Sequence, residues 1–222
     1  MSSASPQQTI SDLAGFRHVW EPRGFAGGDS PVLLLLHGTG GDEYDMLGLG
    51  SALAPSAAVL SPRGRVLEGR SNRFFRRLAE GVFDLEDLKL RTSELADFVS
   101  KASAHYGFNT GSVTAVGFSN GANIAASLLL TYPKLIESAV LLSPMVPFEP
   151  TGQPDLSTAR VFIGAGQADG IAPIADAERL GSILRSFGAD VSLFTHLSGH
   201  TVTQSEIQAA ASWLSAAPSQ SR

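Results

Sequence analysis

The chain has 222 residues, of which 43% are hydrophobic and 17% are charged, and its formal net charge is −5. This composition supports a large buried core and argues against a disordered chain, and the negative charge argues against nucleic acid or an anionic membrane as a general partner. The sequence has no cysteine, which excludes a disulfide, a thiol nucleophile and a cysteine-ligated metal site.

The two ends of the sequence are polar. Residues 1–11 are rich in Ser, Gln and Pro, and we expect them and residues 218–222 to form loose tails. The first residues lack a basic segment followed by an apolar run, so no signal peptide is expected. No apolar run reaches the roughly 18 residues of a membrane span. A cytoplasmic protein that does not bind membranes is therefore expected.

The first half of the chain contains two short apolar runs. A short strand is predicted over residues 16–20, and a turn or hairpin from Pro22 to Pro31. Val32–Leu36 is five consecutive apolar residues, which is typical of a strand buried on both faces. A helix over 44–53 and a buried strand over 57–60 follow.

The next segment differs in composition from the apolar runs before it. Pro62 to Gly81 is predicted to be irregular and is strongly basic. Apolar residues then recur at spacings of three, four and seven, which predicts an amphipathic helix over 85–106. Gly107 stands where a helix C-cap is expected.

Strands and helices alternate to the end of the chain. The predicted strands are 113–116, 138–143, 161–164 and 191–197, and the predicted helices are 122–130, 177–187 and 203–214. Such alternation predicts a single α/β domain over residues 1–222, with a mainly parallel sheet and helices on both faces. Only about 17 residues separate Ser143 from Val161, which leaves no room for a large cap domain.

A possible nucleophile lies between one strand and the next helix. Gly117-Phe118-Ser119-Asn120-Gly121 reads G-x-S-x-G, and a strand–turn–helix context makes this pattern a candidate nucleophile elbow with Ser119 exposed at the carboxyl end of the sheet. The two glycines are expected because so tight a turn presses its flanking residues against the backbone. The alternative is a glycine-rich turn without chemistry.

A serine nucleophile needs a base to take its proton. Two histidines follow Ser119 in the chain. His200 lies in a loop after the last predicted strand, at the carboxyl end of the sheet, and is the predicted base. His196 lies inside the strand pattern, and we keep it as the second candidate.

The base needs an acid to orient it. Asp169 follows the strand over 161–164, again at the carboxyl end of the sheet, and is the predicted acid. Asp155 and Asp190 precede strands and so lie at the wrong end, whereas Asp176 is predicted on a helix. Position along the chain, and not residue type, selects Asp169.

The developing negative charge needs backbone N–H donors. One is expected from Asn120, the residue after the nucleophile. The other is expected from Thr39, in the glycine-rich loop that follows Val32–Leu36. A phosphate-binding turn is the alternative for this loop, but it lacks the Lys-Ser/Thr and the spacing of the known phosphate motifs.

Six motifs over residues 32–214 are shared with one group of enzymes: His37 to Glu43, Ser61 to Gly64, Arg73 to Arg77, Gly117 to Ala122, Gly166 to Asp169 with Pro173, and Gly199-His200. On these residues the chain resembles the small serine carboxylesterase/phospholipase family of α/β hydrolases. That family includes acyl-protein thioesterases, lysophospholipases and a bacterial branch of hydroquinone-induced esterases.

The resemblance implies ester hydrolysis through Ser119, Asp169 and His200, with no cofactor and no metal. One departure limits it. Acyl-protein thioesterases carry Leu-Gly-Asp after His-Gly, whereas this chain has Thr39-Gly40-Gly41. Their long-chain acyl channel is therefore not implied.

Six of the 16 basic residues are arginines between positions 63 and 77. Most are expected to form solvated ion pairs. Because this segment leaves the carboxyl end of a strand, at least one of Arg73, Arg76 and Arg77 is predicted to face the site and bind a substrate carboxylate. Phe74 and Phe75 are predicted to wall the substrate pocket.

The sequence therefore predicts a serine carboxylesterase for short-chain, soluble esters, with a small-molecule ester as its partner. A ligand-binding protein without turnover is the alternative from another class. A lysophospholipase or thioesterase, a perhydrolase and a peptidase are alternatives on the same fold, because the triad chemistry is shared. A homodimer is compatible with this fold.

Overall fold

The apolar run Val32–Leu36 forms β3, a strand with every side chain buried. Side chains alternate between the two faces of a strand. Those of Val32, Leu34 and Leu36 pack into one hydrophobic cluster, and those of Leu33 and Leu35 pack into a second cluster on the opposite face. Burying each such side chain contributes about 1.5–3 kcal/mol, so β3 anchors both layers of the core.

The structure is a computed structural model that describes residues 8–136 and 138–216. Residues 1–7 of the predicted N-terminal tail, and the predicted tail over 218–222, lie outside the described residues. Within the described ranges, the strands of the main sheet are β1 (Thr9–Leu13), β2 (Phe16–Glu21), β3 (Val32–Leu36), β4 (Ala58–Pro62), β9 (Val113–Phe118), β10 (Ser138–Leu142), β11 (Arg160–Gly166) and β12 (Asp190–His196).

Two small hairpins lie outside the main sheet: β5 (Val66–Glu68) with β6 (Ser71–Arg73), and β7 (Arg77–Ala79) with β8 (Val82–Phe83). The helices are α1 (Leu47–Leu53), α2 (Leu85–Tyr106), α3 (Asn120–Thr131), α4 (Ile174–Ser186), α5 (Gln204–Ser215) and the short 3-10 turn η1 (Thr110–Ser112).

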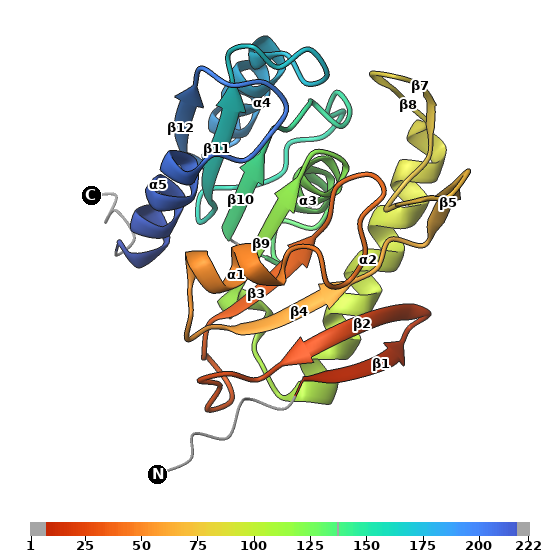
Figure 1. The fold of residues 1–222 in the computed structure, drawn as a ribbon, viewed down its shortest axis with the longest axis vertical. Helices are drawn as coiled ribbons and strands as arrows, with labels where there is room; N and C mark the ends of the chain where they lie inside the picture. The colour runs from red at the N-terminus through yellow and green to blue at the C-terminus, as the bar shows by residue number, and fades with distance from the viewer. Residues whose placement is uncertain (1–7, 137, 217–222) are drawn as a thin grey trace.

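The main sheet has eight strands in the order β1-β2-β4-β3-β9-β10-β11-β12 (Figure 1). The pairs β1–β2 and β2–β4 are antiparallel, and all the other pairs are parallel. Strands β3, β9, β11 and β12 therefore end at one edge of the sheet. This edge is where the sequence predicted the active site.

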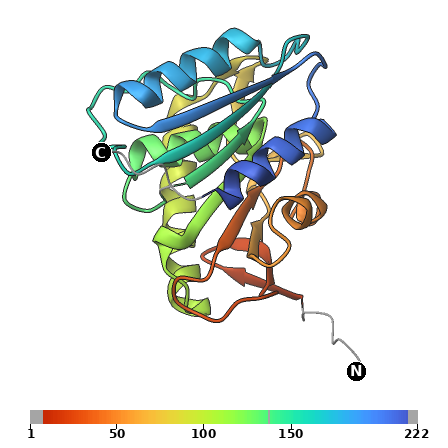
Figure 2. The ribbon, with the colours of Figure 1, turned by 90° about the vertical axis from the view of Figure 1, so that its left-hand side faces the viewer.

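Helices cover both faces of the sheet (Figure 2). Buried residues of α2, α3 and α4 belong to one hydrophobic cluster, and those of α1 and α5 belong to the other. The predicted fold class, a mainly parallel α/β sheet with helices on both faces, is confirmed. The segment between β10 and β11 contains no helix or strand within the described residues, so no large cap covers the site from there.

Two helix ends are capped as the sequence predicted. Helix α2 spans Leu85–Tyr106, and Gly107 caps it in the left-handed conformation with φ 79°. At the start of α5, Thr203 and Glu206 form the predicted capping box, in which each side chain accepts a hydrogen bond from the backbone of the other residue.

Three predicted segments differ from the structure. Strand β1 begins at Thr9, because residues 9–13 pair with β2, so the predicted tail is wrong for residues 9–11. Helix α1 begins at Leu47 and not at Tyr44, because the side chains of Asp42 and Asp45 hold the preceding residues in a turn. The segment 62–81 is not irregular throughout, since it contains the β5–β6 hairpin and part of β7–β8.

The segment 22–31 forms turns and not a hairpin. In this segment Gly28 makes an isolated parallel bridge to Phe108. Among the helices in residues 8–136 and 138–216, none is both long and apolar enough to cross a membrane.

Candidate active site

The turn between β9 and α3 is tightly constrained. Ser119 has φ 52° and ψ −114°, a strained conformation for a residue with a side chain. A Cβ atom at Gly121 would lie 1.9 Å from the carbonyl oxygen of Leu36, and one at Gly117 would lie 2.4 Å from the carbonyl oxygen of Gly121. Only glycine fits at either position, as the G-x-S-x-G pattern predicted.

Ser119, His200 and Asp169 form one chain of hydrogen bonds. The Nε2 atom of His200 lies 2.9 Å from Oγ of Ser119, and its Nδ1 atom lies 2.7 Å from Oδ2 of Asp169. Ser119 follows β9, Asp169 follows β11 and His200 follows β12. Because these strands are parallel, the sheet brings their loops to one edge. The structure thus brings together the three residues that the sequence selected.

Asp169 is held in its ionised form. Its Oδ1 atom accepts hydrogen bonds from the backbone N–H groups of Ile171 and Ala172, both at 2.9 Å. Burial favours the neutral acid, but the hydrogen bonds from Ala172, His200 and Ile171 outweigh it and lower the pKa of Asp169. An ionised Asp169 accepts the Nδ1 proton of His200, which leaves Nε2 free to accept the proton of Ser119.

The other candidate residues lie elsewhere. His196, the second candidate base, is buried at the end of β12, with its Nε2 atom 3.4 Å from Oε2 of Glu206. Asp190 begins β12, at the end of the strand opposite to His200. Asp176 lies in the first turn of α4, and Asp155 accepts a hydrogen bond from the backbone of Ser157.

Two predicted backbone donors lie beside the serine. Asn120 is the first residue of α3, so its N–H group points out of the helix end without an intrahelical partner. Thr39 lines the same cavity as Ser119 and His200. Both residues line the cavity that contains Ser119, and their role as oxyanion donors stays a prediction.

The loop that carries Thr39 is held in place by Asn72, which the sequence did not single out, and by Arg73, which it predicted to bind substrate. The backbone of Gly40 donates to the carbonyl oxygen of Asn72 at 2.8 Å, and Nδ2 of Asn72 donates to the carbonyl oxygen of Gly41 at 2.9 Å. Arg73 donates from Nη1 to Oγ1 of Thr39 at 2.5 Å. The β5–β6 hairpin thus fixes the position of Thr39.

His37 fixes the start of the same loop. Its Nε2 atom accepts a hydrogen bond from the N–H of Gly64 at 2.9 Å, so its proton must lie on Nδ1, which is 2.7 Å from the carbonyl oxygen of Gly38. Burial lowers the pKa of His37 despite the opposing hydrogen bond to Gly38. His37 is therefore a neutral structural residue.

The prediction for Phe74 and Phe75 is wrong. Both side chains are buried in the core, where Phe74 packs on the ring of His37 and Phe75 on the ring of Phe83. The backbone N–H of Phe74 donates to Oδ1 of Asn120 at 2.7 Å, which draws the segment inward. The Asn120 side chain therefore has a structural role, and the backbone N–H of Asn120 stays the predicted oxyanion donor.

A cavity of about 380 Å³ opens at Ser119. Arg73 and Arg77 both line it, together with Glu80, Met145, Ser119 and His200. Arg76 does not line it, because its exposed side chain pairs with Asp84 at 2.7 Å. Two of the three candidate arginines therefore face the site, and Arg76 does not.

Arg73 lies in a crowded cationic environment. Its side chain is 4% exposed, and Glu68 lies within ion-pair distance of both Arg73 (3.4 Å) and Arg77 (2.8 Å). Burial and the charge of Arg77 both lower the pKa of Arg73, against the opposing effect of Glu68. Two guanidinium groups thus share one carboxylate beside the cavity.

Comparison with known proteins agrees with this geometry. The family model described as Phospholipase/Carboxylesterase matches residues 83–217. The chain belongs to this phospholipase/carboxylesterase family. The family assignment made from sequence motifs is confirmed, and the fold is that of an α/β hydrolase.

Several relatives of this family align over most of the chain. MhqD of Bacillus subtilis (strain 168) is 47% identical over 197 residues, which are 89% of this chain and 96% of that protein. The Bacillus cereus carboxylesterase structure superposes with a TM-score of 0.86 and 45% identity, covering 89% of this chain and 92% of that chain. The structure of YahD with malic acid has a TM-score of 0.77 and 34% identity, covering 84% of this chain and 93% of that chain.

The described residues contain no group of three or more His, Cys, Asp or Glu side chains that could hold a metal ion. The residues at Ser119 are donors and acceptors suited to proton transfer and to the binding of an oxyanion.

Glu206 is an ionisable residue that the sequence identified only as part of a helix cap. Its side chain is buried against His196, and a Cβ atom at Gly164 would lie 1.8 Å from its Oε1 atom. Burial raises the pKa of Glu206 from its ordinary value of 4.5 to about 7, against the opposing hydrogen bond from the backbone of Thr203. Its Oε1 atom has no hydrogen-bond partner among the described residues.

This raised pKa predicts a loss of stability with rising pH. Between about pH 4.5 and 7 the folded state holds a proton on Glu206 that the unfolded state releases, so stability falls across this window and stays lower above it. Glu206→Gln cannot ionise and removes this loss. By differential scanning calorimetry, the Tm of the wild-type protein should therefore fall relative to that of Glu206→Gln between about pH 4.5 and 7 and should stay lower above that range.

The exposed Glu178 on α4 provides the matched control. Glu178→Gln should follow the wild-type protein at every pH. A Tm difference between wild type and Glu206→Gln that stays constant across the range would contradict the raised pKa of Glu206.

Proposed function

We propose that this protein is a serine carboxylesterase that hydrolyses short-chain, soluble esters through an acyl-enzyme on Ser119. The observation that carries the proposal is the continuous hydrogen-bonded chain from Oγ of Ser119 through His200 to Asp169. Membership of the phospholipase/carboxylesterase family supports an ester as the substrate.

In the first half of the reaction, Oγ of Ser119 attacks the ester carbonyl carbon while Nε2 of His200 takes the hydroxyl proton. The carbonyl oxygen becomes an oxyanion, which the N–H groups of Thr39 and Asn120 stabilise. When the tetrahedral intermediate collapses, the bond to the alcohol oxygen breaks and His200 gives its proton to that oxygen. The acyl group remains on Ser119.

In the second half, water replaces the alcohol. His200 takes a proton from the water, and the resulting hydroxide attacks the acyl carbon. The bond to Ser119 breaks, His200 returns the proton to Oγ, and the carboxylic acid leaves. Asp169 stays ionised throughout and stabilises the imidazolium that forms twice in each cycle.

The shape of the cavity favours small substrates. It has a volume of about 380 Å³, and Phe83, Met145 and Ile171 line it together with the arginines. The small volume and the charged lining of this cavity disfavour placing in it the long acyl chain of a lysophospholipase or thioesterase substrate. The hydrogen-bonded chain at Ser119 disfavours a ligand-binding protein without turnover. A perhydrolase or a peptidase would use the same residues.

Arg73 and Arg77 are proposed to bind an anionic group of the substrate. One carboxylate, that of Glu68, serves both guanidinium groups, so a second anion in the cavity would relieve their repulsion and gain charge-assisted hydrogen bonds. The related YahD was solved with malic acid, a dicarboxylic acid, which supports an anionic substrate. Homodimerisation and a cytoplasmic location remain predictions from the sequence.

Removing the nucleophile tests the proposed reaction. Ser119→Ala should lower kcat for 4-nitrophenyl acetate by at least about 10³-fold, because no acyl-enzyme can form. Ser182→Ala, at an exposed position on α4, should behave as the wild-type protein. Turnover by Ser119→Ala at the wild-type rate would refute the proposed mechanism.

Comparing anionic with neutral esters tests whether the arginines that line the cavity bind an anionic group of the substrate. Arg77→Ala should lower kcat/KM for a monoester of a dicarboxylic acid by at least about tenfold relative to its neutral diester, because one charge-assisted hydrogen bond contributes about 1.5–3 kcal/mol. Arg76→Ala removes a neighbouring arginine that points away from the cavity and should keep the wild-type ratio. Equal ratios in wild type, Arg77→Ala and Arg76→Ala would contradict the anion site.

A further inference from the structure

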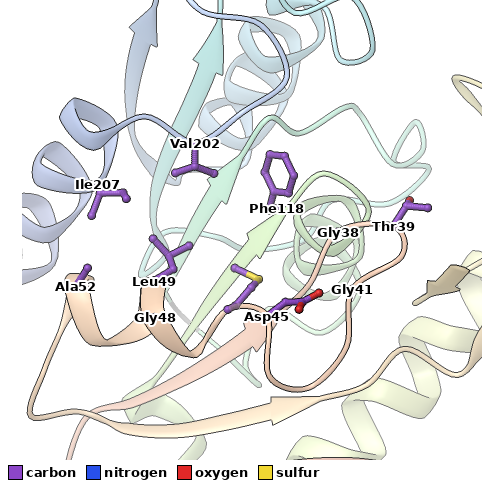
Figure 3. Close-up of a pocket in the computed structure, with 11 residues that line it drawn as sticks. Gly38, Thr39, Gly41, Asp45, Gly48, Leu49, Ala52, Phe118, Val202 and Ile207 are labelled. Carbon is purple, nitrogen blue, oxygen red and sulfur yellow. The ribbon is translucent and has the colours of Figure 1, made fainter.

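A second cavity adjoins the one that contains Ser119. It has a volume of about 430 Å³ and lies between α1, the end of β9 and the segment that joins β12 to α5 (Figure 3). Leu49 and Ala52 reach it from α1, Phe118 from β9, and Val202 and Ile207 from the other side. Its size is that of a small-molecule site.

The walls of this cavity are almost entirely apolar. Met46 is buried beneath it, and Leu49, Val202 and Ile207 are half-buried side chains that face the hollow. Asp45 is the one charged residue in its lining, and the Oδ2 atom of Asp45 already accepts a hydrogen bond from the backbone of Asp42 at 3.0 Å. An apolar group would bury these side chains further, whereas an anionic group would be repelled by the carboxylate of Asp45.

The two cavities share part of their lining. Thr39 and Phe118 line both of them, and Phe118 directly precedes Ser119. The ring centroid of Phe118 lies 5.0 Å from that of His200. A Cβ atom at Gly38 would lie 2.9 Å from Cδ1 of Phe118, so the glycine makes room for the ring. Ser119 and His200 line the first cavity and not the second, so an ester held at Ser119 would enter the second cavity by passing Thr39 or Phe118.

We propose that the cavity at Met46, Leu49 and Ile207 is a subsite for an uncharged, apolar half of the ester, a compact aromatic or branched aliphatic group. The arginine-lined cavity holds the other half, which is polar or anionic. The substrate class is thus an ester with two chemically unlike halves. This inference rests on the proposed esterase function and deepens it.

Two positions on α1 set the size of this subsite. Gly48 and Ala52 are one helical turn apart, and both line the cavity. A Cβ atom at Gly48 would meet no atom within 4 Å, and the backbone of Gly48 does not have a positive φ. Leucine is therefore sterically accommodated at position 48, and at either position its side chain would occupy the hollow.

Selectivity between small and large esters tests the subsite. Two series are compared by kcat/KM: acetate esters of alcohols from methanol to benzyl alcohol, and methyl esters of acids from acetic to phenylacetic acid. In Gly48→Leu and Ala52→Leu, the ratio of the largest to the smallest ester should fall at least about tenfold in one series, because a hydrophobic pocket discriminates by about 10–200-fold per methylene group. The series that responds identifies whether the subsite holds the alcohol or the acyl half.

Ser51 lies on the same helix but does not line the cavity, so Ser51→Ala is the matched control and should keep the wild-type ratios in both series. Wild-type ratios in both leucine variants, with thermal unfolding confirming that they are folded, would overturn the subsite. Failure of the esterase function itself is distinct, since it would appear as the absence of any Ser119-dependent turnover in the wild-type protein.

Discussion

The close approach of the β9–α3 turn to the end of β3 is the constraint on which the site depends. With Gly121 against the carbonyl oxygen of Leu36, no side chain fits between them, and Ser119 is left in a strained conformation with its hydroxyl at the sheet edge. The same contact brings the loop after β3, which carries Thr39, next to Ser119. One packing constraint therefore places both Ser119 and this loop. The buried strand β3 supplies the rigid base for this arrangement.

The segment that follows β4 has a structural role in addition to the substrate binding that we propose for it. Asn72 and Arg73 hold the loop of Thr39, and the N–H of Gly64 holds His37. Arg73 therefore connects the loop that carries Thr39 to the side of the cavity that Arg73 and Arg77 line. Because its side chain is buried and already bonded, Arg73 is preorganised, and a bound anion would not need to order it.

The linings of the two cavities indicate which kind of ester the proposed enzyme would accept. One cavity is lined by two guanidinium groups and the other mainly by apolar side chains, and Thr39 lines both. A substrate with an anionic half and an apolar half would satisfy both walls, whereas a symmetric apolar ester would leave the arginines without a ligand. Selectivity would then come from the difference between the halves and not from chain length.

Much of the site follows from sequence because its parts obey local rules. A strand–glycine turn–helix pattern predicts where Ser119 lies, and the rule that parallel strands end at one edge selects His200 and Asp169 over their rivals. The sequence could not place Phe74, Phe75 and Arg76, because their orientation depends on long-range hydrogen bonds such as that from Phe74 to the Asn120 side chain. The start of α1 was missed for a different reason, since two aspartate side chains compete with the helix for backbone hydrogen bonds.

The central claim is that Ser119 is a nucleophile activated by His200. The most direct measurement is reaction with a fluorophosphonate, which reacts preferentially with activated serines, followed by peptide mass mapping of the wild-type protein and of His200→Ala. The account predicts about one label per chain on the peptide that contains Ser119, and a loss of nearly all labelling in His200→Ala. Labelling of another serine, or equal labelling of the two proteins, would contradict it.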